Sequence, residues 1–341
     1  MNPKISVIMS VYNEEAYLPE SMGSILSQTE EDFEVIVIDD CSADRSAEII
    51  EGYHDPRIHL IRNEENRGLT KNLNTALDYC RGRYIARMDG DDISLPDRFE
   101  HQMAYMDAHP NLMLTGTQTQ TFGAQSMIWR LSNDPEDLRI RMLLRPVLAH
   151  PTFMMRRELI FEHGFRYDES FRSAQDYDLA QRVSEQFDIG IVPEVLLRYR
   201  THKKQVSSVS GGLQRSNADR VRTRQLERLE VILDEIQQDV YGRWAREEDI
   251  NDMSSIDSAG GIIDTICRSG NAASLYKYDR IYPVLTGQLF TWAFHEHSLP
   301  MAGKLLRACR TPRDAAICAA TAADIGRKKL KNHTYLSPEH G

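Results

Sequence analysis

The chain has few cysteines and no long apolar run, and each of these features excludes certain classes of protein. Its five cysteines are scattered over 341 residues, and no CxxC or Cys/His metal-binding spacing occurs. We therefore expect free thiols in a reducing compartment rather than a disulfide framework or a zinc site. No stretch approaches the ~20 apolar residues of a membrane-spanning helix, and no signal peptide opens the chain. The sequence predicts a cytosolic protein, attached at most to the inner face of a membrane.

The chain also lacks the glycine-rich phosphate loops of many nucleotide-binding proteins. No GxGxxG follows a predicted strand, which disfavours a dehydrogenase. The first strand leads into Tyr12-Asn13-Glu14-Glu15, which has neither glycine nor cation, so a nucleotidyltransferase stays only as an alternative. The formal net charge is −10, with 41 Lys and Arg against 51 Asp and Glu. This balance argues against nucleic-acid binding driven by electrostatics.

What is present is a regular alternation of strand-like and helix-like segments over the first 110 or so residues. Such alternation predicts an α/β fold, with a mostly parallel sheet covered by helices on both faces. From 112 to 202 the pattern is more mixed. The expected strands are 5–12, 33–38, 58–61, 84–86, 152–155 and 195–200, and the expected helices are 18–28, 44–53, 69–80, 96–108 and 177–186.

A Ser/Gly-rich break at 207–212 predicts a boundary between an α/β domain over 1–210 and an α-helical accessory domain over 211–341. The helical domain could dimerise or bind the catalytic domain. Its basic cluster at 327–331 is either a solvated helix end or a peripheral membrane contact. The helices expected there are 213–246, 262–267, 282–295, 301–309 and 312–331.

The acidic run Met88-Asp89-Gly90-Asp91-Asp92 directly follows the fourth predicted strand. Carboxylates this close repel one another unless a cation joins them, and a hard divalent ion takes oxygen ligands and shares them with phosphates. In open α/β sheets, ligands bind outside the carboxyl ends of the strands. The run therefore predicts a metal–diphosphate site. An acidic loop with solvated charges is the alternative reading.

Other polar side chains also follow predicted strands. They include Tyr12, Asn13 and Glu14 after the first strand and Asp40 after the second, while Lys71 lies in the first turn of the third helix. Each has an ordinary alternative, because Asn favours turns, Asp caps helices and a helical Lys can simply be exposed. Their common placement at one edge of the sheet favours a ligand site.

Together these segments resemble the family-2 glycosyltransferases of the GT-A type, over about residues 3–205. Each piece alone would be weak, but the set is specific, and nothing comparable covers 213–341. The matching text is Ile5-Ser-Val-Ile-Met-Ser-Val-Tyr-Asn-Glu, Ser24-Ile-Leu-Ser-Gln-Thr, Val37-Ile-Asp-Asp-Cys-Ser, Asn66-Arg-Gly-Leu, Met88-Asp-Gly-Asp-Asp and Leu95-Pro-Asp-Arg.

The resemblance implies an inverting glycosyltransferase. Its donor would be a nucleotide-diphosphate sugar, most often a UDP-sugar, and its acceptor a saccharide or lipid-linked saccharide in bacterial surface polysaccharide assembly (O-antigen, capsule or exopolysaccharide). The resemblance also implies roles for individual residues. Tyr12, Asn13 and Glu14 would form part of the nucleoside pocket, Asp40 would contact the uracil and Lys71 the nucleotide. Asp89 would contact the ribose or order the loop, and the ligands of Mn²⁺ or Mg²⁺ would be Asp91, Asp92 and His202.

The resemblance also implies the catalytic base. Gln175-Asp176 stands where the family has a Glu-Asp pair, and the family's base is the second residue, Asp176. A carboxylate suits removal of the acceptor hydroxyl's proton, although Asp176 could equally cap the helix that follows. Gln175 in place of Glu supports a different alternative, a binding module without turnover. His202 could be a surface residue, and Trp129 could shape the acceptor cleft or pack under its loop.

Overall fold

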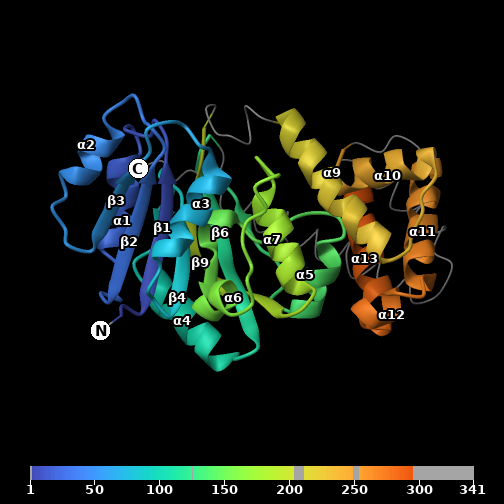
Figure 1. The fold of residues 1–341 in the computed structure, drawn as a ribbon. Coiled ribbons are helices and arrows are strands. Elements are labelled where there is room, and N and C mark those ends of the chain that lie inside the picture. The colour runs from blue at the N-terminus through green and yellow to red at the C-terminus, as the bar shows by residue number, and fades with distance from the viewer. Residues whose placement is uncertain (1, 125, 203–210, 249–252, 295–341) are drawn as a thin grey trace, which may run out of the picture. The chain divides into compact units, whose positions relative to one another are not determined.

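The structure, a computed structural model, describes residues 2–124, 126–202, 211–248 and 253–294 (Figure 1). The chain divides into two compact units, the first made of 1–142 and 146–221, the second of 143–145 and 222–341. The Ser/Gly-rich break up to residue 210, the expected helices at 301–309 and 312–331, and the basic cluster at 327–331 lie outside the described residues.

The first unit is built on one sheet with helices on both faces (Figure 1). Its elements are β1 (Ile5–Val11), α1 (Leu18–Leu26), β2 (Phe33–Asp39), α2 (Ser46–Glu51), β3 (Ile58–Arg62), α3 (Leu69–Tyr79), β4 (Tyr84–Met88), β5 (Ile93–Ser94), α4 (Arg98–Ala108), β6 (Leu112–Gly123), β7 (Ile128–Trp129), α5 (Pro135–Arg141), the 3-10 helix η1 (His150–Thr152), β8 (Met154–Arg156), α6 (Arg157–Phe161), α7 (Gln175–Ser184), β9 (Asp188–Thr201) and the start of α9 (Gly211–Arg228).

The sheet order is β3-β2-β1-β4-β8-β6-β9-β5, with β7 paired to β6. The first four strands are parallel, as expected, while β8, β5 and β7 pair antiparallel with their neighbours. The sheet is therefore mixed beyond β4, because short return strands need no helical crossover. Since β1, β2 and β4 run in parallel, their carboxyl ends meet at one edge, where Val11 pairs with Asp39.

Two apolar cores lie on the two faces of the sheet. Ile5, Val7 and Met9 of β1 pack in a cluster with side chains of α1, α2 and α4. Ile8 points the other way, into a cluster with α3, α5, α6 and α7. Alternate residues of a strand face opposite sides, so burial on both faces makes β1 and β2 nearly continuous apolar runs. The α/β expectation is thereby confirmed.

The second unit is helical. It contains the end of α9, α10 (Glu235–Ala245), α11 (Met253–Arg268), α12 (Ala272–Leu275) and α13 (Tyr278–Phe294). The single helix expected over 213–246 is instead two helices. Glu230 adopts a left-handed φ of 56° just after α9, and Asp234 then forms a capping box with Gln237 that starts α10. Within the described ranges, no helix is long and apolar enough to cross a membrane.

Candidate functional site

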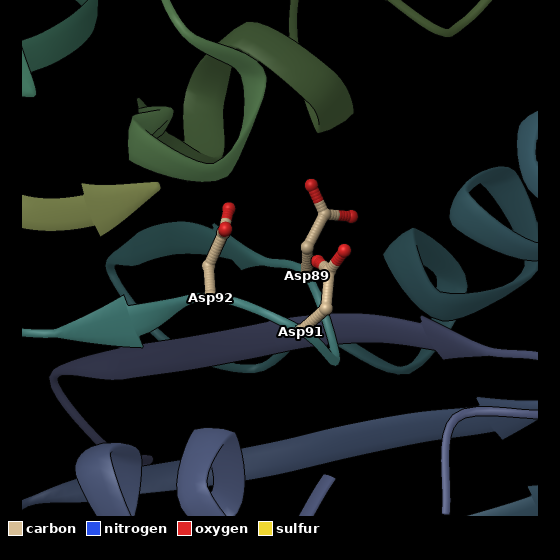
Figure 2. A group of neighbouring side chains, drawn as sticks. All are labelled: Asp89, Asp91 and Asp92. Atoms are coloured by element: carbon tan, nitrogen blue, oxygen red, sulfur yellow. The ribbon is translucent and has the colours of Figure 1, made fainter. Parts of the chain in front are cut away.

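The loop after β4 gathers the acidic run into a cluster of three carboxylates. Asp89, Asp91 and Asp92 each offer an oxygen within 4.8 Å of the others, and Figure 2 shows the three side chains pointing to the same side of the loop. Asp92 is fully buried, and its Oδ1 accepts a hydrogen bond of 2.8 Å from the backbone N–H of Arg200. Its Oδ2 has no hydrogen-bond partner among the described residues. A buried, unpaired carboxylate oxygen beside two more carboxylates fits a hard divalent cation.

The pKa shifts of the carboxylates in this loop also favour a bound cation. Burial, and then the negative charges of Asp89 and Asp91, raise the pKa of Asp92 well above its usual range, against the hydrogen bond from Arg200. Burial also raises the pKa of Asp89, although Arg87 opposes the rise. Carboxylates whose charges are this costly are stabilised when a cation neutralises them. The cluster could therefore hold a metal ion.

Glu14 belongs to the same acidic group, although the sequence places it with the nucleoside pocket. Its carboxylate packs against Gly90, where an added Cβ would lie 1.7 Å from Oε2 of Glu14. Only glycine leaves room for this contact, which explains the Gly between Asp89 and Asp91. Burial, then the charges of Asp91 and Asp89, raise the pKa of Glu14 well above normal.

Arg87 supplies a positive charge to this acidic group, and it was not among the site residues predicted from the sequence. Its two terminal nitrogens donate to both carboxylate oxygens of Asp89. The Arg87 side chain is only 2 % exposed, in the middle of the sheet. Its charge also opposes the burial-driven rise in the pKa of Asp176 and of Glu14. An arginine in a buried strand, just before an acidic run, was the available signal, since a buried charge must be paired.

Asp176 lies in the first turn of α7. Ala174, just before the helix, has a left-handed φ of 57°, an unfavourable conformation for a residue with a Cβ. Burial raises the pKa of Asp176, while the N–H of Tyr177 and the charge of Arg87 oppose the rise. The charge of Asp176 in turn raises the pKa of Asp89. Asp176 and the carboxylate cluster belong to the same unit, and Asp176 interacts electrostatically with Asp89.

Tyr167 and His150 also lie in this region and were not assigned a role from sequence. The hydroxyl of Tyr167 and Nε2 of His150 are 2.9 Å apart, and both side chains are buried. Burial, opposed by Arg87, raises the pKa of Tyr167, and the charges of Asp176 and Asp89 raise it further. Burial, then Arg87, lowers the pKa of His150 well below normal. His150 is therefore neutral at physiological pH.

His202, at the end of β9, reaches the same loop. Its Nε2 lies 2.9 Å from Oδ2 of Asp91, and its ring contacts that of Tyr17 in a tilted arrangement, 4.8 Å between centroids. Arg200 donates from Nε to the backbone carbonyl of Asp91 at 2.7 Å, and its guanidinium lies 4.7 Å from the centroid of the Tyr17 ring. The structure therefore brings His202 together with Asp91 at the mouth of the acidic loop.

Asp40 has a structural task that the sequence did not predict. Its carboxylate accepts hydrogen bonds from the backbone N–H of Arg67 (2.7 Å) and Gly68 (2.9 Å) and from Asn63 Nδ2 (2.9 Å). Burial acts to raise the pKa of Asp40, but the hydrogen bonds from Arg67, Asn63 and Asn72 leave it below normal. Asp40 is thus ionised and fixes the loop before α3.

The remaining expected residues lie at the same edge of the sheet. Asn13, with a φ of 55°, donates from its N–H to Ser42 Oγ at 3.0 Å and accepts at Oδ1 from the Ala43 N–H at 2.8 Å. These bonds join the loops after β1 and β2. Tyr12 is exposed beside them, and Lys71 is exposed in the first turn of α3.

Comparison with known proteins places these features in context. The family model described as "Glycosyl transferase family 2" matches residues 6–164. An uncharacterized glycosyltransferase of Haemophilus influenzae is 32% identical over 233 residues, which is 64% of this chain and 72% of that protein. The O-antigen biosynthesis glycosyltransferase WbnJ of Escherichia coli is 34% identical over 210 residues, 59% of this chain and 80% of WbnJ.

The fold is also found in solved structures. The crystal structure of Staphylococcus aureus TarS 1–349 in complex with UDP-GlcNAc superposes with a TM-score of 0.58 at 21% identity. The match covers 83% of this chain and 90% of that one. At this identity the likeness concerns the fold alone.

Proposed function

Since the chain belongs to glycosyltransferase family 2, we propose that it transfers a sugar from a UDP-sugar to an acceptor hydroxyl with inversion at the anomeric carbon. The observation that carries the proposal is the electrostatic interaction of Asp176 with Asp89 of the carboxylate cluster and with Arg87. One carboxylate near a cation site is what a single in-line displacement needs, because no covalent intermediate is formed.

The metal site of the proposal consists of Asp91, Asp92 and His202. Both oxygens of Asp89 already accept from Arg87, so Asp89 is better suited to ordering the loop and contacting the ribose. Two carboxylates and an imidazole suit Mn²⁺ or Mg²⁺ when substrate phosphates complete the ligand set. A bound ion would stabilise the negative charge that develops on the departing UDP.

Asp176 is the proposed general base. Its raised pKa makes its carboxylate a stronger proton acceptor than that of an exposed aspartate. It would take the proton of the acceptor hydroxyl while that oxygen attacks the anomeric carbon. The left-handed residue Ala174 precedes α7, in whose first turn Asp176 lies.

The nucleoside would bind at the edge formed by the loops after β1 and β2. Tyr12, Asn13 and Glu14 would line this pocket, Asp40 would accept the uracil N–H, and Lys71 would reach the nucleotide. The carboxylate of Asp40 is held in place by the N–H groups of Arg67 and Gly68 and by Asn63, so it is a fixed, ionised acceptor at this edge. The acceptor of the proposal is a saccharide or lipid-linked saccharide in surface polysaccharide assembly, the process that WbnJ's name describes. The catalytic domain would comprise 1–210 and the helical accessory domain 211–341.

The proposal is tested by nucleotide release from UDP-, GDP- and dTDP-sugars with Mn²⁺. We expect release from a UDP-sugar, which stops when the metal is chelated. Asp91→Ala should weaken Mn²⁺-dependent UDP binding, measured by calorimetry, while the matched change Asp97→Ala, at a half-buried position beyond the loop, should leave it intact. UDP binding without any turnover would instead favour the alternative of a non-catalytic binding module, to which Gln175 points.

A further inference from the structure

Strand β7 is a short edge strand that is held firmly to β6. Thr119 pairs with Trp129 and Gln120 with Ile128. The Gln118 side chain accepts from the N–H of Leu131 and donates to its carbonyl, both at 2.9 Å. Because these hydrogen bonds hold the segment that follows β7, the side chains of β7 point in fixed directions.

Strand β7 and the residues that flank it nonetheless expose apolar side chains. Trp129 is 40% exposed, and Met127, Ile128 and Leu131 are exposed as well. The other two tryptophans of the chain, Trp244 and Trp292, are 0% and 4% exposed. Leaving an indole half in water has a free-energy cost that a packing role would avoid. The second reading of Trp129, that it packs under its loop, does not account for this exposure.

The indole stands next to the reaction site. Trp129 and Tyr199 are 5.4 Å apart between ring centroids, with the rings tilted by 38°. Tyr199 lies on β9, opposite Thr121 of β6, and the next residue, Arg200, donates its N–H to Asp92. Burial, then the charges of Asp89, Asp92 and Asp91, raise the pKa of the Tyr199 phenol. One residue thus separates the aromatic pair from the carboxylate cluster.

We propose that the exposed face of Trp129, supported from behind by Tyr199, is the platform on which a pyranose ring of the acceptor saccharide stacks. This inference rests on the proposed glycosyl transfer and adds where the acceptor binds. One face of a pyranose carries axial C–H groups and is apolar, while its hydroxyls point outwards, so an indole can cover the ring without unpairing polar groups. A sugar held there lies beside the cluster that binds the donor's diphosphate.

The first test uses fluorescence and needs no turnover. Because Trp244 and Trp292 are buried, acrylamide should quench mainly the emission of Trp129. Methyl glucopyranoside, methyl galactopyranoside and N-acetylglucosamine, added with UDP and Mn²⁺, should reduce quenching in a saturable way, and the acyclic polyol sorbitol should not. In Trp129→Phe the quenchable component and its protection should both vanish. Protection by phosphatidylglycerol vesicles but by none of the sugars would overturn the proposal and assign a lipid surface instead.

The second test separates the acceptor from the donor. Trp129→Ala should raise KM for the best of these sugar acceptors by about 3- to 10-fold, with kcat nearly unchanged. Hydrolysis of the UDP-sugar by water should keep its rate, and Trp129→Phe should recover part of the lost affinity. Ile128→Ala is the matched control, since Ile128 is exposed on the opposite face of the same strand, and its KM should stay that of the wild type.

The outcomes distinguish the two proposals. An unchanged acceptor KM in Trp129→Ala would overturn the platform while leaving glycosyl transfer standing. Loss of donor hydrolysis together with transfer would also overturn it, because the ring would then support the donor site. A wild-type protein that releases no nucleotide from any sugar donor would end the proposed function, whereas the quenching test would still decide whether sugars bind at Trp129.

Discussion

Arg87 and Asp89 form a bidentate ion pair, in which both oxygens of the carboxylate accept hydrogen bonds from the guanidinium. The pair places one fixed positive charge among several carboxylates that would otherwise repel one another. It also ties the start of the acidic loop to β4, so that Asp91 and Asp92 project from an anchored backbone. The carboxylates near this charge are Glu14, Asp89, Asp92 and Asp176.

We predict that Arg87→Met lowers the free energy of unfolding by up to about 3 kcal/mol, because it leaves the partly buried Asp89 without its partner. Adding Asp89→Asn should restore more than about 1 kcal/mol, since the unpaired charge is then gone. Urea denaturation of the four variants of this cycle measures the coupling. Arg83→Met is the control, because Arg83 pairs with Asp107 on the surface and its loss should cost about 1 kcal/mol or less. Additive losses would contradict the pairing.

Asp176→Asn should lower turnover on the order of 10²–10⁴-fold, because the amide cannot accept the proton of the acceptor hydroxyl. UDP affinity with Mn²⁺, measured by calorimetry, should stay nearly unchanged. The matched control is Asp178→Asn, two residues on in α7, where the carboxylate pairs with Arg182 rather than facing the cluster. This variant should lose stability yet keep its turnover per folded molecule. Near-normal transfer by Asp176→Asn would refute the base assignment.

The stabilising effect of Mn²⁺ should grow with pH. The folded protein raises the pKa of Asp92 and Glu14, so between the unfolded and folded pKa values it binds more protons than the unfolded chain. Without metal, stability from these groups is therefore lost as the pH rises. A cation competes with those protons and replaces them, giving about 2.7 kcal/mol at 100 times its Kd.

Thermal melts with and without Mn²⁺, at about pH 5.5 and about pH 7.5, compare a more protonated with a more ionised cluster. The shift in Tm should be larger at the higher pH. Asp92→Asn should flatten this dependence, since it removes one of the two titrating groups. A shift that is equal at both values, or larger in acid, would speak against a cation held by these carboxylates.

Gly90→Ala should destabilise the protein by about 1–3 kcal/mol, because the added methyl group collides with the carboxylate of Glu14. Combining it with Glu14→Ala removes the obstacle and should recover part of the loss. Gly23→Ala is the matched control: no atom lies within 4 Å of a Cβ built there, and alanine in the middle of α1 should add about 0.5–1 kcal/mol. Denaturation midpoints of the three variants provide the comparison.

The parts of the fold that the sequence predicts are those with a local signal. Strands β1 to β4 and their helices follow from apolar periodicity, and the acidic loop from adjacent residues. Strands β5 and β7, with two residues each, are too short to carry a period. Strand β6 escapes for a different reason. Its buried Thr and Gln residues give no apolar strand signal, yet Gln118 and Thr121 satisfy their polar groups on Leu131 and Met127, which flank β7.

The site divides in the same way. The carboxylates of the acidic loop are visible in the chain because they are neighbours, and family motifs mark Asp176 and His202. Arg87, Tyr167 and Glu14 acquire their surroundings only through contacts between distant segments. Glu14, for example, meets Gly90 across 76 positions. Such relations depend on packing, which a single sequence does not display.

The hydrogen bonds that Asp40 and Asn13 make have a thermodynamic consequence. They immobilise the loops after β1, β2 and β3 before any ligand arrives. A nucleotide that binds at this edge therefore orders little additional chain, so its binding should carry no large entropic penalty. Its association should also lack the slow kinetic phase of a loop that folds around a ligand.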